Sequence, residues 1–206
     1  MQRGRHDSEL ASLHFHKGDI AVSAQMFRKA IAQFRQVGNP SGVATAESDL
    51  AASLLPQGKL QQAKQLMEQS IPDYQAVEDK EGVALTLNNL GDLARQSGNL
   101  GVAETDYQQA KATAQEIGDK DAVAYVLTGL GDVLTDRGDL AAARKSYEES
   151  LALRDQLGEK QNATETKGGA RAIVNRRRTP RRYRSFSEKI QGAISSRPTS
   201  RRRTSD

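Results

Sequence analysis

Residues 87–110 read LNNLGDLARQSGNLGVAETDYQQA, and the spacing of their apolar residues decides the fold. On either side of Gly98 the apolar residues step by three and four positions, which places each set on one face of a helix. The first set is Leu87, Leu90 and Ala94, and the second is Leu100, Ala103, Tyr107 and Ala110. Glycine adopts the left-handed conformation that commonly ends a helix, so Gly98 predicts a turn between two antiparallel helices.

This helix pair recurs along the chain every 40 residues. The turn glycine has equivalents at Gly18, Gly58 and Gly138, and three further sets keep the same register: Leu10, Leu50, Leu90 and Leu130; Ala11, Ala51, Gly91 and Gly131; Ser23, Ala63, Ala103 and Ala143. A fixed period of this size is typical of stacked repeats, in which each unit packs on its neighbours. We therefore expect an all-α solenoid of antiparallel helix pairs, an α-α superhelix, with helices at about 7–17, 19–37, 40–56, 59–77, 80–97, 99–117, 120–137 and 139–157.

Other residues predict where these helices begin and end. Glycines are expected to end the second helix in three units, at Gly38, Gly118 and Gly158. Asn39 and Asp119 are expected to cap the helices that follow. Pro56 and Pro72 fall near the end of one predicted helix and inside another, and each removes a backbone donor. We expect each proline to kink or shorten its helix.

The segments GDLARQSGNLGVAETDYQQA and GDVLTDRGDLAAARKSYEESLAL resemble the tetratricopeptide repeat. They share Leu-Gly, a short gap, Gly-Asn/Asp-Leu, Ala, then Tyr and Ala or Ser. The unit is longer than that family's usual length of about 34 residues and is similar to the longer variety found in kinesin light chains and bacterial regulatory proteins. The resemblance covers residues 7–165. HEAT and armadillo repeats also have periods of about 40–47 residues, but small residues at fixed positions favour the tetratricopeptide repeat.

The resemblance implies that the first helix of each pair lines a concave groove that binds a protein or peptide. The candidate groove residues are Thr45, Ser48, Asp49, Leu85, Asn88, Asn89, Asp92, Arg95, Tyr125, Thr128 and Asp132. Asn88 and Asn89 can each donate and accept hydrogen bonds, as an extended peptide backbone requires. Asn89 matches the family's peptide-holding asparagine, whereas Asp49 and Gly129 replace it in the neighbouring units. Asp49 and Asp92 would repel a carboxylate, which favours a basic or neutral ligand. The alternative is that these are solvated polar residues of a helix face.

Composition excludes several classes of function. The chain has no cysteine, so thiolate metal sites, disulfides and thiol nucleophiles are excluded. No Ser/His/acid set, phosphate-binding loop or cluster of metal ligands stands out, so we expect no catalytic residue, no cofactor, no metal and no enzymatic activity. No apolar run reaches membrane-spanning length, and MQRGRHDSEL lacks the apolar segment of a secretory signal. These features predict a cytoplasmic protein.

Charge divides the chain. Residues 1–170 carry 18 Lys and Arg against 24 Asp and Glu, whereas residues 171–206 carry 12 against 2. The repeat pattern is lost after Glu165, where Lys167 and Ala170 replace the expected leucines. We divide the chain into a partial repeat helix at 1–17, a repeat array at 18–165, and a basic tail at 166–206 that is predicted to be disordered.

Three hypotheses account for the tail. It binds nucleic acid or another polyanion, it carries phosphorylation sites at Thr179, Ser185 and Ser187, or it is an out-of-frame extension of a truncated array. The candidate polyanion-binding residues are Arg176, Arg177, Arg178, Arg181, Arg182 and Arg184.

Both ends of the array look uncapped, which predicts self-association or a fragment of a longer protein. We predict a protein- or peptide-binding scaffold, part of a bacterial signalling or regulatory protein, with polyanion binding by the tail as the alternative.

Overall fold

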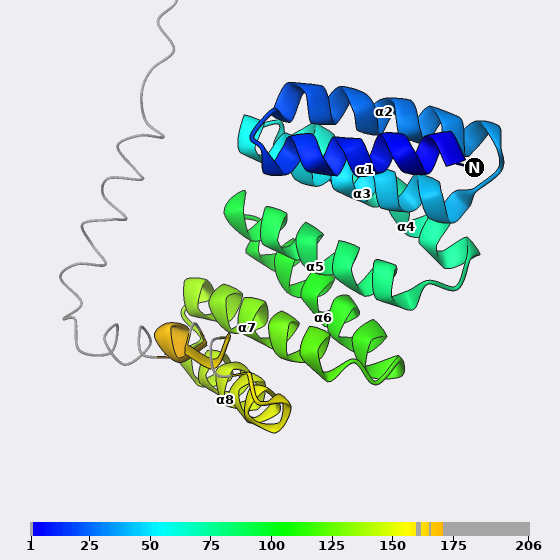
Figure 1. Ribbon diagram of the computed structural model, residues 1–206. Helices are drawn as coiled ribbons and strands as arrows, with labels where there is room; N and C mark the ends of the chain where they lie inside the picture. The colour runs from blue at the N-terminus through cyan, green and yellow to red at the C-terminus, as the bar shows by residue number, and fades with distance from the viewer. Residues whose placement is uncertain (1, 160–161, 165, 171–206) are drawn as a thin grey trace, which may run out of the picture. The chain divides into compact units, whose positions relative to one another are not determined.

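The computed structural model describes residues 2–159, 162–164 and 166–170, and in this part of the chain helices alternate with short turns (Figure 1). The helices are α1 (Gln2–His16), α2 (Ile20–Gln36), α3 (Pro40–Leu54), η1 (Leu55–Gln57), α4 (Leu60–Ala76), α5 (Lys80–Gln96), α6 (Leu100–Glu116), α7 (Lys120–Arg137) and α8 (Leu140–Leu157). Each α-helix packs on the next, and the first helices of neighbouring units also touch, α1 with α3 and α5 with α7. The predicted all-α solenoid of helix pairs is confirmed.

The predicted helix ends have the expected chemistry. The seven turn glycines have positive φ angles: Gly18, Gly38, Gly58, Gly98, Gly118, Gly138 and Gly158. Asn39 accepts a hydrogen bond from the backbone N–H of Gly42 at 3.1 Å, and Asp119 accepts one from that of Ala122 at 2.9 Å. Each bond satisfies one of the donors that a helix start leaves unpaired. Both predicted caps are therefore confirmed.

The two prolines behave differently. Pro56 lies in the 3₁₀ turn η1, and α3 ends before it at Leu54, so the expected shortening is confirmed. Helix α4, in contrast, runs through Pro72 to Ala76, so the expectation that Pro72 shortens its helix is wrong. Pro72 is exposed, and the carbonyl of Glu68 that lacks its usual N–H partner can therefore be hydrated.

A helical segment follows α8. The expectation that α8 lacks such a partner is wrong, because residues 162–164 and 166–170 are helical. Ala163 and Thr166 are buried, and the Thr166 hydroxyl lies 3.2 Å from that of Thr128 on α7. In this register Ala163 and Thr166 take the positions of Val123 and Val126 in the preceding unit. The compact unit extends from Met1 to Ala170.

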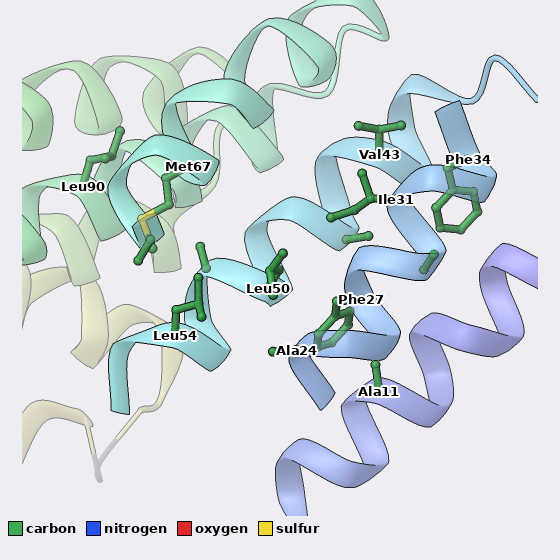
Figure 2. Packing of buried hydrophobic residues seen from close by; sticks show 14 residues of the cluster. Ala11, Ala24, Phe27, Ile31, Phe34, Val43, Leu50, Leu54, Met67 and Leu90 are labelled. Carbon is green, nitrogen blue, oxygen red and sulfur yellow. The ribbon is translucent and has the colours of Figure 1, made fainter. Parts of the chain in front are cut away.

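The core runs along the array from one unit to the next. Figure 2 shows side chains from α1 to α5 directed into one shared layer, with Phe27 of α2 and Leu50 of α3 among them. Leu90 of α5 joins this layer, so the third unit contributes to the core of the first two. Alanines fill the closest contacts, and Ala11 and Ala51 have no exposed surface. This continuous layer holds neighbouring helices at the separation on which the surface sites depend.

Candidate functional site

The first helices α5 and α7 pack on one another and border a cavity of about 330 Å³. Leu85 and Tyr125 lie 40 residues apart at equivalent positions and both line it. Their exposed fractions are 58% and 55%, large for apolar side chains in a helical array. Exposed apolar groups gathered at a cavity provide a contact surface for a partner.

Asn88 supplies a hydrogen-bond acceptor at this cavity. Its side chain is 2% exposed, and its Nδ2 group donates to Oδ2 of Asp92 at 3.4 Å. Its Oδ1 atom is buried and has no hydrogen-bond partner among the described residues. A buried amide oxygen left unpaired costs about 1–3 kcal/mol, so a donor brought by a ligand would be favoured there.

Arg154 supplies a donor at the same cavity, which the sequence analysis missed. It is 3% exposed, and its Nη1 group donates to Oε2 of Glu159 at 2.9 Å. Its Nε group is buried without a partner in the described part of the chain. Asn162, also at the cavity, donates to the same Glu159 oxygen at 3.1 Å. A signal for Arg154 exists, because the earlier units place Phe34, Tyr74 and Ala114 in this register.

Acidic side chains predominate around the cavity. Glu81, Asp119 and Asp121 line it, while the charge of Arg154 is paired with Glu159. Partial burial and a hydrogen bond with Glu159 raise the pKa of Asp121. Hydrogen bonding from Asn162 contributes most to lowering the pKa of Glu159. The lining therefore favours a neutral or basic ligand over an acidic one.

Asp92 and Asp132, two of the predicted groove residues, each accept a hydrogen bond from a tyrosine of a second helix. The Tyr107 hydroxyl donates to Asp92 at 2.6 Å, and the Tyr147 hydroxyl donates to Asp132 at 2.5 Å. Burial and the neighbouring carboxylate raise the pKa of each tyrosine, and burial raises the pKa of Asp92. These bonds join the two helices of one unit, so both carboxylates also serve the fold.

Arg95 and Thr128 also make contacts between elements. The Arg95 guanidinium on α5 lies 3.7 Å from Asp132 and 3.4 Å from Asp136, both on α7. Thr128 lies with its hydroxyl 3.0 Å from that of Ser150 on α8. These two predicted residues therefore join neighbouring helices.

The predicted residues of the second unit lie away from the cavity, on α3. Thr45 is exposed and donates to the backbone carbonyl of Ser41 at 3.0 Å. Ser48 is half-buried and donates to the hydroxyl of Ser70 at 3.3 Å. Asp49 is half-buried, and burial raises its pKa. Of the predicted groove residues, the cavity brings together Leu85, Asn88 and Tyr125.

At Gly129 the interruption of the asparagine pattern has a packing cause, whereas Asp49 keeps a side chain in the same register. A Cβ atom added at Gly129 would lie 2.6 Å from the ring of Tyr107, so no side chain fits at this position. For Asn89, one unit earlier in the same register, the residue at the position of that tyrosine is Met67. The tyrosine of the third unit thus excludes an asparagine from the fourth.

Some sequence predictions fall outside this site. The tail arginines lie outside the described residues: Arg176, Arg177, Arg178, Arg181, Arg182 and Arg184. Within the described ranges no group of His, Cys, Asp and Glu could hold a metal ion. None of the helices described is long and apolar enough to cross a membrane.

Stacked helix pairs with a lined cavity on their first helices define the class of helical-repeat scaffolds. The model of the family "Tetratricopeptide repeat" matches residues 2–76 and 82–156, and the chain belongs to this family. Repeats of this family generally mediate binding between proteins.

A solved structure shares the fold. The crystal structure of BtubC (BKLC) from P. vanneervenii is similar with a TM-score of 0.75 and 22% sequence identity, over 98% of this chain and 85% of that chain. A comparison with curated proteins gave no match. The predicted tetratricopeptide array is confirmed.

Proposed function

We propose that this chain is a scaffold that binds an extended segment of a partner protein across α5 and α7. The observation that carries this proposal is a pair of buried groups at one cavity, Oδ1 of Asn88 and Nε of Arg154, which have no partner among the described residues. A peptide group presents one N–H donor and one C=O acceptor. One acceptor and one donor on the cavity wall complement it whatever the side chains of the segment.

The remaining lining indicates which segments bind. Leu85 and Tyr125 offer apolar surface on either side of the cavity. The acidic groups Glu81 and Asp121 oppose a carboxylate and favour a neutral or basic segment. We therefore propose a partner segment with at least one apolar side chain and no net negative charge.

The biological setting follows from the sequence resemblance alone. We propose a binding role without catalysis, in a cytoplasmic protein of bacterial signalling or regulation. The same resemblance supports Asn89 as a second contact for the bound segment, because it occupies the family's peptide-holding position and is half-buried on α5.

Quantitative affinity capture tests the proposal. The full chain is compared with a Leu85→Ala/Tyr125→Ala variant, in which both changes lie on exposed side chains. We expect captured partners to fall at least tenfold, since truncating a central hot-spot side chain of an interface costs about 2 kcal/mol or more. Val102→Ala on α6 is the matched control, because Val102 is 50% exposed away from the cavity. Equal recovery with all three proteins would contradict the proposed site.

A further inference from the structure

A second groove lies between the second helices α2 and α4, with α3 beneath them. Its volume is about 370 Å³. Ile31, Leu50 and Leu54 contribute apolar side chains to it, and Figure 2 shows these residues within the core layer of the first two units. Glu47 of α3 lies among them, and Arg28 and Arg35 of α2 also line the groove.

Only one of the two carboxylate oxygens of Glu47 has a hydrogen-bond partner among the described residues. Its side chain is 1% exposed, and its Oε1 atom accepts a hydrogen bond from Arg35 at 2.5 Å. Its Oε2 atom is buried and has no partner among the described residues. Arg35 reaches this carboxylate from the solvent side, since 60% of its side chain is exposed. A buried carboxylate oxygen without a donor is a strong acceptor for any group that enters the groove.

The fold does not require an acid at this position. The same register holds Leu87 in the third unit and Leu127 in the fourth. Leu127 lines a cavity of about 410 Å³ between α6 and α8, whose lining carboxylates, Asp119 and Glu149, lie at other positions. The first unit has Asp7 in this register, but both of its oxygens have partners, Gln33 at 2.8 Å and Lys29 at 3.4 Å. Of the two acids in this register, Asp7 and Glu47, only Glu47 has a carboxylate oxygen without a partner among the described residues. That oxygen can accept a hydrogen bond from a ligand.

The shape and charge of the groove select one kind of group. An apolar passage with a carboxylate at its floor fits a side chain with an aliphatic stem and a cationic tip. Because Arg35 already takes Oε1, a single oxygen remains, and this suits a point-like ammonium better than the two-pronged guanidinium of an arginine. Arg28 and Arg35 at the groove would repel further cations and attract acidic neighbours of the inserted group.

We propose that the groove between α2 and α4 binds a lysine side chain of a partner polypeptide, with its ammonium on Oε2 of Glu47. Gln62, Gln65 and Gln69 along α4 supply donors and acceptors for the backbone of that segment. Acidic residues beside the lysine pair with Arg28. This site lies on α2, α3 and α4 and shares no lining residue with the cavity between α5 and α7.

The ammonium site is tested with n-butylammonium, which reproduces the lysine side chain, on the isotope-labelled full chain by NMR. We expect amide shift changes within residues 28–35, 47–54 and 62–69, and no such changes with n-butanol. Glu47→Leu should abolish the response and still fold, because leucine occupies this register in later units. Asn88→Ala should leave it intact. No response to the ammonium, an equal response to n-butanol, or an unchanged response in Glu47→Leu would overturn the proposal and leave a buried water as the occupant.

The polypeptide partner is tested by selecting a random peptide library on the full chain, with counter-selection on Glu47→Leu. We expect selected peptides to share one fixed lysine with acidic neighbours, and replacement of that lysine by norleucine to weaken binding at least tenfold. Failure to obtain peptides that depend on Glu47, or a fixed residue other than lysine, would overturn the proposal. A response to n-butylammonium without lysine-bearing peptides would overturn the polypeptide assignment in favour of a small amine.

Discussion

At the scale of single residues, the four units serve as an internal alignment of packing partners. A position near the end of each second helix has a register partner near the start of the next first helix, and the structure brings the first two pairs into contact. The pairs are Phe34 with Gly42, Tyr74 with Gly82, Ala114 with Ala122, and Arg154 with Asn162. The aromatic residues face glycine because a Cβ at Gly42 would lie 2.5 Å from the ring of Phe34. Close packing of this kind couples the choice of one residue to that of its partner.

Glu78 is the exception among the turn residues, and it predicts a stabilising substitution. Its φ angle is +57°, where an L-residue with a Cβ is strained and glycine is not. We expect Glu78→Gly to raise the free energy of unfolding by about 1 kcal/mol, measured by urea denaturation. The reverse change, Gly118→Glu, tests the same cause, since Gly118 has φ +70° and open space around it. A loss of similar size there supports backbone strain, and unchanged stability in both variants would refute it.

Glu47 predicts a pH dependence of stability. Burial, partly offset by Arg35, raises its pKa above the ordinary value of 4.5. The folded state therefore binds the proton more tightly than the unfolded state, and stability is lost as pH rises from about 4.5 through the raised folded pKa. We expect Glu47→Gln to gain stability relative to the wild type over this window, in denaturation curves recorded from acid to neutral pH. The exposed Glu9→Gln is the control, and a constant difference across pH would contradict the assignment.

At the scale of helices, Tyr107 of α6 wedges between two first helices. A Cβ at Gly91 of α5 would lie 2.9 Å from its ring, and one at Gly129 of α7 would lie 2.6 Å away. We expect Gly129→Asn, which restores the family's asparagine, to cost about 1–3 kcal/mol through overpacking. Tyr107→Met should relieve this cost, because Met67 of the second unit and Asn89 of the third occupy the same two register positions. A double-mutant cycle by thermal denaturation measures the coupling, and additive effects would exclude the wedge.

The sequence predicts helices well and unpaired polar atoms poorly. Gly98 and its equivalents, together with Asn39 and Asp119, place the helix ends within a few residues because caps and left-handed turns depend on local chemistry. Leu85, Asn88 and Tyr125 follow from the resemblance, which assigns the first helix of each pair to the groove. Arg154 and Asn162 were missed because the repeat pattern assigns no role to either position, and their shared partner Glu159 lies in the turn after α8. Whether a buried oxygen such as Oε2 of Glu47 has a donor depends on side-chain geometry that no periodic pattern contains.

At the scale of the whole molecule, the division of charge predicts a salt-dependent interaction of the tail. Six of its arginines are tested together by changing each to glutamine in the full chain: Arg176, Arg177, Arg178, Arg181, Arg182 and Arg184. If the polyanion hypothesis holds, binding of a single-stranded oligonucleotide weakens with salt, and the variant lowers the slope of log K against log salt by about 4. Fluorescence anisotropy measures both. Absence of binding by the wild type at low salt would end this hypothesis and leave the array as the binding element.

Acidic residues replace leucines in the first two units, which predicts that the N-terminal part of the array is less stable than the later part. Asp7 and Glu47 place carboxylates where Leu87 and Leu127 place apolar groups, so the layers that join the first two units are held less strongly than the later ones. In a chain of units coupled to nearest neighbours, the weaker end opens first. Amide hydrogen exchange is therefore expected to proceed faster in α1 and α3 than in α5 and α7. Local unfolding would then begin at the N-terminal helices, and a partner bound at Glu47 would slow this opening.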